Sequence, residues 1–399
     1  MCSSHLRAHT AGCFASSALC KPHATEAGVM ARHPSDEQPR GDRNSKRRPS
    51  IGRVPVVSVE GKPLMPCKPA KARKLMRDGL AIKRWSKLGV FYIQLTRPVG
   101  NKIQDMSLAV DPGAKYDGYA VATRKETALK GMAILPHRVA KKMEERRRLR
   151  RTRRYRNTWQ RPKRFNNRRR DGWIAPSQLA KVQLRLKVAR ELCRLYPIQH
   201  ILVEDIRFNH YRKRYGGFFS TAEIGKTLLY GELEKLAELI KYEGWQTLKF
   251  RKEYNIPKLT KKDSLTPGSH ANDAVALLCG FYGKNVNAPS PFLYWQRLEL
   301  ARRSLHRQNP QPGGVRPEFG GTAKGHWLRK GDYVEAEYGD RIIRGWVVGI
   351  AKAGIGIANE FGKRLCQAAE KKVRLLCRST GITWAHSSPS FRRGTPAPI

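Results

Sequence analysis

An acidic residue at the end of an apolar strand is the feature that most constrains this chain. The segment "LAVDPGAKYDGYAVAT", residues 108–123, runs from apolar residues into Asp111, and Pro112-Gly113 then breaks the strand. A second apolar stretch, 119–122, follows at once. Because a buried carboxylate is costly without a partner, the segment predicts a β-meander whose first strand ends in a functional acid.

Two more acids occupy comparable positions. Glu204 ends the apolar strand "HILVE", and Asp273 lies in the first turn of an apolar helix that begins near His270. Residues three apart share a helix face, so His270 and Asp273 point toward the same place. Taken singly, each acid is also explained as a helix-capping or turn residue.

Taken together, the three acids indicate a metal site. Clustered carboxylates remain ionised at modest cost only with a cation between them, and oxygen ligands suit hard divalent cations. Asp111, Glu204 and Asp273 are therefore predicted to bind two Mg²⁺ ions, with Mn²⁺ as a substitute, which would activate a water and stabilise the leaving oxygen of a phosphodiester. A β-meander, a later strand and a final helix, each with one acid, follow the layout of RNase H-like nucleases.

The net charge of +47, from 79 basic and 32 acidic residues, calls for a polyanionic partner. Nucleic acid is the first candidate, and a ribosomal-type protein that merely solvates RNA is the alternative. No apolar run approaches the roughly 18 residues that would span a membrane, so no membrane partner is expected. Eight cysteines without a CxxC pair, and no secretory signal, favour free thiols and a cytoplasmic location.

Basic residues are densest in 137–170, which holds 17 Lys or Arg and two acids. Its composition before Pro162 favours a helix, and aromatic residues among arginines suit contact with bases and phosphates. A solvated charged tail is the alternative. The predicted nucleic-acid contacts are Arg146, Arg147, Arg150, Arg151, Arg153, Arg154, Tyr155, Arg156, Trp159, Arg161, Lys163, Arg164, Arg168 and Arg169.

Five segments in order resemble one family. "LAVDPGAKYDGYAVA", "ILVEDIRF" and "HANDAVAL" are similar to the three RuvC motifs of IscB-like proteins, transposon-encoded relatives of type II CRISPR nucleases. The arginine run resembles their bridge helix, and "GKPLMPCKPAKARKLMRDGLAIKR" resembles their N-terminal PLMP domain. IscB proteins carry an HNH nuclease between the second and third RuvC motifs. Here 65 residues with a single histidine, His210, separate Glu204 from His270, so the chain resembles IsrB, the branch without HNH.

The resemblance implies an activity and partners. It implies an RNA-guided DNA nickase of the OMEGA class that cuts the non-target strand of double-stranded DNA, as a monomer bound to a structured guide RNA in a prokaryotic cell. It implies that His270 acts beside the metals, as a general base or a contact to the scissile phosphate. It also makes Arg341, Arg344 and Lys352 candidate contacts to a target-adjacent motif. An unguided resolvase or transposase, and a noncatalytic RNA-binding protein, are the alternatives.

The expected fold class is α/β, with a split RNase H-like domain, an arginine-rich bridge helix, a small PLMP domain and a C-terminal α+β or barrel-like domain. The expected divisions are a disordered extension at 1–52, a PLMP domain at 53–100, RuvC part I at 101–136, the bridge helix at 137–171, RuvC part II at 172–208, a connector with RuvC part III at 209–283, a linker with a short helix at 284–325, and the target-motif domain with a disordered tail at 326–399.

Three local predictions depend on periodicity alone. Apolar spacing predicts one helix over 221–243, and "QTLKFRKEY" predicts a strand at 246–254. The segment "FLYWQRLELARRSLHR" predicts a short helix within 292–307. A further helix is expected from Ser177 to about Tyr196, with Pro176 just outside it.

Overall fold

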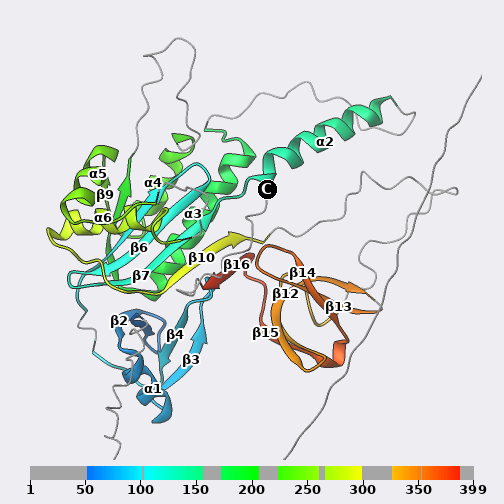
Figure 1. Ribbon diagram of the computed structural model, residues 1–399, viewed down its shortest axis with the longest axis horizontal. Helices are drawn as coiled ribbons and strands as arrows, with labels where there is room; N and C mark the ends of the chain where they lie inside the picture. Colours follow the sequence, from blue (N-terminus) through cyan, green and yellow to red (C-terminus); the bar gives the residue numbers. More distant parts are fainter. Residues whose placement is uncertain are drawn as a thin grey trace, which may run out of the picture. The chain divides into compact units, whose positions relative to one another are not determined.

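The computed structural model describes residues 52–100, 103–155, 172–205, 223–259, 266–298, 326–351 and 353–386. All of them belong to one compact unit, 48–399, which contains three sheets and several helices, a mixed α/β architecture (Figure 1). Apart from Gly52, the extension expected at 1–52 lies outside the described residues.

The first sheet has four strands in the order β2-β1-β4-β3. Its strands are β1 (Val54–Val57), β2 (Pro63–Cys67), β3 (Ala81–Trp85) and β4 (Phe91–Leu95). Helix α1 (Pro69–Arg77) packs its buried Ala72 against the sheet residues Val56, Ala81 and Ile93. Gly79 takes the turn after this helix at φ +68°, a backbone conformation that glycine adopts without strain.

The central sheet has seven strands in the order β16-β10-β7-β6-β5-β8-β9. The antiparallel meander predicted from the opening motif is formed by β5 (Met106–Pro112), β6 (Tyr116–Thr123) and β7 (Thr127–Ile134). Two parallel strands, β8 (Ile198–Glu204) and β9 (Glu238–Tyr242), continue the sheet beside β5. At the other edge, β10 (Phe292–Arg297) pairs parallel with β7, and β16 (Ile382–His386) pairs antiparallel with β10.

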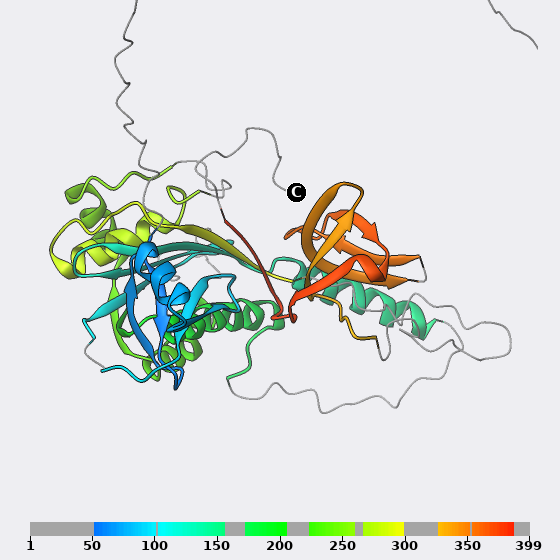
Figure 2. The same cartoon turned by 90° about the horizontal axis from the view of Figure 1, so that it is seen from below.

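Helices cover both faces of this sheet (Figure 2). On one face, α3 (Pro176–Leu195) and α4 (Lys226–Glu234) pack on alternate residues such as Leu108 and Val110. On the opposite face, α6 (Ala271–Tyr282) packs on Ala109 and its neighbours, with α5 (Gly244–Glu253) beside it. The basic helix α2 (Arg138–Arg154) leads from β7 toward α3.

Two predictions between 221 and 254 are wrong. The helix expected over 221–243 ends at Glu234, and its second half forms β9, because Leu239 and Ile240 pair with β8 to complete the parallel edge. The strand expected at 246–254 is the helix α5. It begins with a capping box in which Glu243 and Gln246 satisfy each other's backbone N–H groups.

Three further segments differ from expectation. The segment that begins at Phe292 forms the strand β10, whose fully buried Trp295 donates its indole N–H to the Leu88 carbonyl at 2.9 Å; the remainder of the predicted helix, from 299 onward, lies outside the described residues. Residues 382–386, assigned to the C-terminal domain, supply β16 to the central sheet. Pro176 is the first residue of α3 rather than its neighbour, which suits a residue without an N–H.

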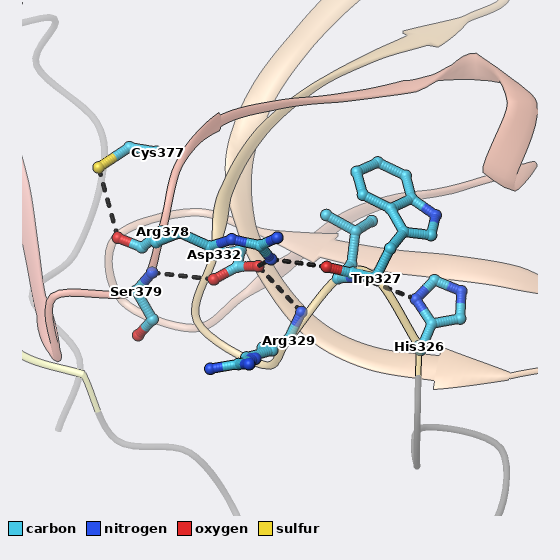
Figure 3. A network of polar contacts seen from close by, with 8 residues as sticks. His326, Trp327, Arg329, Asp332, Cys377, Arg378 and Ser379 are labelled. Carbon is cyan, nitrogen blue, oxygen red and sulfur yellow. Dashed lines mark hydrogen bonds and ion pairs between the residues drawn. The ribbon is translucent and has the colours of Figure 1, made fainter.

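The third sheet has the order β14-β13-β12-β11-β15. It contains β11 (Tyr333–Tyr338), β12 (Arg341–Ala351), β13 (Gly354–Ala358), β14 (Arg364–Ala368) and β15 (Val373–Cys377), with the short turn η2 (Glu370–Lys372) as the described helical element. The fully buried Asp332 connects the segment before β11 with the segment after β15. It accepts hydrogen bonds from the Arg378 guanidinium at 2.8 Å, Ser379 N at 2.8 Å and Arg329 N at 2.9 Å (Figure 3). The region expected to be α+β or barrel-like is, in its described residues, an antiparallel sheet.

Candidate active site

Asp111 and Glu204 meet because two neighbouring parallel strands end at the same level. Val110 of β5 is in register with Val203 of β8, so the next residue of each strand is the acid. Side chains alternate along a strand, and Ala109 and Leu202 both pack under α6. Asp111 and Glu204 therefore project from the α6 face, and each is 9% exposed.

The start of α6 reaches these acids through a glycine. Gly118 of β6 pairs with Asp111, and a β-carbon built on it would lie 2.4 Å from the backbone oxygen of His270. Only a residue without a side chain lets the helix approach so closely. Asp273, in the first turn of α6 and 4% exposed, is thereby held at the same edge of the sheet.

The three carboxylates act on one another electrostatically. Burial, the negative charge of Glu204, a hydrogen bond between the two carboxyls and the charge of Asp273 together raise the pKa of Asp111 well above its usual range. Burial raises the pKa of Glu204 as well, with a further contribution from Asp273, although the hydrogen bond with Asp111 acts in the opposite direction. Their mutual repulsion and burial thus disfavour the ionised forms of Asp111 and Glu204.

Two cations that the sequence reading missed contact Asp273. Arg251 Nη1 of α5 lies 3.1 Å from its Oδ1, and the Lys258 ammonium donates to its Oδ2. Lys258 also lowers the pKa values of Asp111 and Glu204. Sequence reasoning overlooked Arg251 because "QTLKFRKEY" was expected to be a strand, whereas this segment forms the helix α5. Nothing in the local pattern around Lys258 indicated its contact with Asp273.

The donor set suits a divalent cation, although the present arrangement does not enclose one. In the described ranges, no group of three or more His, Cys, Asp or Glu side chains is arranged to hold a metal ion. Both oxygens of Asp273 are engaged by cations, Oδ1 by Arg251 and Oδ2 by Lys258. Even so, Asp111 and Glu204 are buried, have raised pKa values and lie beside Asp273. A divalent cation bound by their oxygens would stabilise the ionised carboxylates.

His270 precedes α6 as its N-cap and lies against Tyr116 at the start of β6. The ring centroids are 5.0 Å apart and the planes are tilted by 36°. His270 and Asp273 thus both lie at the start of α6. The shared direction of their side chains and the catalytic role of His270 stay predictions.

A buried ion pair on the other face of the sheet fixes the turn after Asp111. Arg185 of α3 donates through Nε and Nη2 to the two oxygens of Asp117, both at 2.9 Å, and through Nη2 to the Gly113 carbonyl at 2.6 Å. Asp117 in turn accepts a hydrogen bond from Gly113 N at 2.9 Å. Sequence reasoning singled out neither Arg185 nor Asp117, because no local pattern connects residues 68 positions apart.

Asp205 follows Glu204 directly but faces the side of the sheet that α4 covers. It accepts hydrogen bonds from the Lys226 ammonium at 2.7 Å and the Tyr230 hydroxyl at 2.9 Å. These three residues line an open cavity of about 630 Å³. Because side chains alternate along the chain, these two adjacent acids lie on opposite faces of the sheet. Asp205 is bound by Lys226 and Tyr230, whereas Glu204 lies near Asp111 and Asp273.

The predicted nucleic-acid contacts are partly described. Arg146, Arg147, Arg150 and Arg151 of α2 are exposed, and Tyr155 just after the helix is 91% exposed. The side chains of Arg153 and Arg154 lie outside the described part, as do the remaining predicted contacts: Arg156, Trp159, Arg161, Lys163, Arg164, Arg168 and Arg169.

Two of the three candidate target-motif contacts, Arg341 and Arg344, lie on β12. Arg344 Nε is 2.7 Å from Glu335, which Arg374 also contacts at 2.6 Å, so this arginine is held in an ion cluster. Arg341 is exposed at the start of the strand, and Lys352 lies outside the described residues. Their role as contacts remains a prediction.

Comparison with known proteins gives three results. A family model described as "RRXRR protein" matches residues 54–218, less than half of the chain. No curated protein matches significantly. Among solved structures, RuvC of Thermus thermophilus in complex with a Holliday junction substrate is 13% identical to this chain, with a TM-score of 0.25. The match covers 45% of this chain and 95% of the RuvC chain. A CRISPR-Cas12f ternary complex is 15% identical, with a TM-score of 0.25, and the match covers 52% of this chain and 47% of the Cas12f chain. None of the described helices has the length and apolar character to cross a membrane.

Proposed function

We propose that this chain is a RuvC-type nuclease and, more specifically, an RNA-guided DNA nickase of the IsrB branch. The observation that carries the proposal is the convergence of Asp111, Glu204 and Asp273 from β5, β8 and α6 at one edge of the central sheet. The family match over 54–218, which contains the arginine-rich segment, also supports it.

Asp111, Glu204 and Asp273 would hold the divalent cations. Two Mg²⁺ ions bound there would supply a Lewis acid for the phosphodiester and a more acidic water. Arg251 and Lys258 would bind the phosphate of the strand to be cut, because both are cations already placed at the acids. Gly118 keeps the helix carrying Asp273 close to the sheet, and Arg185 holds the turn that follows Asp111.

The nicking activity is proposed because one such site cuts one strand in each event. The test uses a supercoiled plasmid with a guide-matched site and a linear copy labelled on each strand. The protein with its copurified RNA and Mg²⁺ should give open circles and cut only the strand that is not paired with the guide. Linear plasmid as the main early product, or equal cutting after removal of the RNA, would favour an unguided resolvase or transposase.

A matched pair of variants connects the cutting to the carboxylates. Glu204→Gln should abolish cutting, whereas Asp205→Asn, one residue further and on the opposite face, should retain it. Both variants should keep their RNA. Equal activity of Glu204→Gln and the unaltered protein would refute the assigned site.

One observation favours a second candidate, a noncatalytic RNA-binding protein. Arg251 and Lys258 balance the charge of Asp273 with protein side chains, an arrangement that a noncatalytic relative of a nuclease would also keep. Calorimetric titration with Mg²⁺ separates the two. Binding that Asp111→Asn removes supports the nuclease, and the absence of binding supports the noncatalytic protein.

A further inference from the structure

The first sheet carries a basic surface with an exposed tryptophan, which we call the α1–β3 surface. It consists of exposed Lys71, Arg73, Lys74 and Arg77 from α1, and exposed Lys83 and Trp85 from β3. Residues 69–85 contain a single acid, Asp78, whose Oδ1 lies 3.4 Å from Arg77 Nε. The surface therefore has a large local excess of positive charge.

Strand alternation places Lys83 and Trp85 on the face that α1 covers. Ala81 of the same strand packs in one cluster with Ala72 of α1, and residues two and four positions further along share its face. β3 is the edge strand of this sheet, so these side chains lie at a border rather than in its centre. The helix and the strand thus present their cations on one side of the sheet.

Trp85 is 57% exposed and yet held in place. Its ring contacts Phe91 edge-on, with centroids 5.4 Å apart and planes at 68°. An aromatic ring held by such a contact and more than half exposed to solvent suits stacking on the face of an unpaired base, and every base has such a face. Bases that are paired in a duplex are not accessible to such a ring.

We propose that the α1–β3 surface binds an unpaired segment of RNA, with Trp85 stacked on a base and the cations of α1 and Lys83 on the phosphates. The occupant is RNA because loops and ends of a structured RNA display unpaired bases. This choice rests on the proposed function, which gives the chain a permanently bound RNA. The surface lies on a different sheet from the carboxylates and uses none of their residues.

The test measures binding of the full chain, freed of copurified RNA and carrying Asp111→Asn, to three probes. They are a 12-nucleotide RNA of mixed sequence, its duplex, and single-stranded DNA of the same sequence. Trp85→Ala should weaken single-stranded RNA binding by about 5- to 100-fold, the loss expected for one stacked base, and leave duplex binding unchanged. Trp85→Phe should retain most of the affinity. Trp327→Ala, which removes an exposed tryptophan of the third sheet, is the matched control and should have no effect.

Ultraviolet cross-linking supplies a readout that local unfolding would not produce. The single-stranded RNA should cross-link to the peptide that contains Trp85, and Lys71→Gln/Lys74→Gln/Lys83→Gln should reduce that cross-link. Equal losses for all three probes in Trp85→Ala, a stronger preference for the DNA, or no cross-link at this peptide would overturn the inference. If the cross-link forms but guided nicking is absent, the proposed function fails and this inference stands.

Discussion

The backbone oxygen of His270 lies so close to Gly118 that a β-carbon at residue 118 would be 2.4 Å away from it. Gly118 pairs with Asp111 across the meander, and His270 caps the helix that carries Asp273. The separation between two predicted metal ligands is therefore set by a residue that has no side chain.

Gly118→Ala should push the start of α6 away from the sheet. We expect a loss of about 1–3 kcal/mol in the free energy of unfolding and a larger loss of cutting, since both parts of the site are displaced. Urea unfolding and plasmid nicking measure the two effects. Gly231→Ala in α4, where a β-carbon meets nothing within 4 Å, is the control and should unfold no more easily. Full nicking by Gly118→Ala would show that the close approach is dispensable.

Asp111→Asn should raise the thermal stability of the protein in the absence of divalent cations. Burial and the neighbouring Glu204 and Asp273 disfavour the ionised carboxylate, and asparagine removes its charge. In the unaltered protein, Mg²⁺ should raise the melting temperature through preferential binding to the folded state. That increase should vanish in the variant. Calorimetry with and without EDTA gives both comparisons, and an equal Mg²⁺ effect in both proteins would contradict the metal site.

Arg185→Met should destabilise the protein by about 3–5 kcal/mol, because it leaves Asp117 buried and unpaired. The double variant Arg185→Met/Asp117→Asn should recover part of this loss, since the uncompensated charge is gone. Denaturant unfolding of both variants, at constant slope, measures the recovery. A double variant as unstable as the single one would mean that the hydrogen bond from Arg185 to Gly113, and not the charge, is decisive.

Replacement of Arg147, Arg150 and Arg151 by glutamine should weaken RNA binding and flatten its salt dependence. Each lost phosphate contact should reduce the slope of log affinity against log salt by roughly 0.7–0.9. Filter binding over a range of salt concentrations measures the slope. The control replaces Arg190 and Lys235, which both pair with Glu232 and should leave the slope unchanged. An unaltered slope in the triple variant would indicate that α2 faces solvent.

The secondary-structure elements that carry the three acids could be predicted from the sequence. Apolar strands that end in Asp111 and Glu204, and the apolar helix that carries Asp273, are local patterns, and the structure places all three where the patterns predicted. The meander and α1 were predictable for the same reason, because side-chain periodicity and turn residues act within a few positions.

Tertiary structure decided what periodicity could not. The segment 238–242 has apolar residues compatible with a helix, and it becomes β9 because β8 offers an unpaired parallel edge. The segment 292–297 becomes β10 because β7 offers a second unpaired edge, with which it pairs parallel. The segment 382–386 then pairs antiparallel with β10 as β16. Arg185, Arg251 and Lys258 reach their acids only after α3 and α5 pack on the sheet. The sequence thus predicted which acids form the candidate site. Strand pairing and helix packing between segments far apart in the chain determined which charges surround those acids.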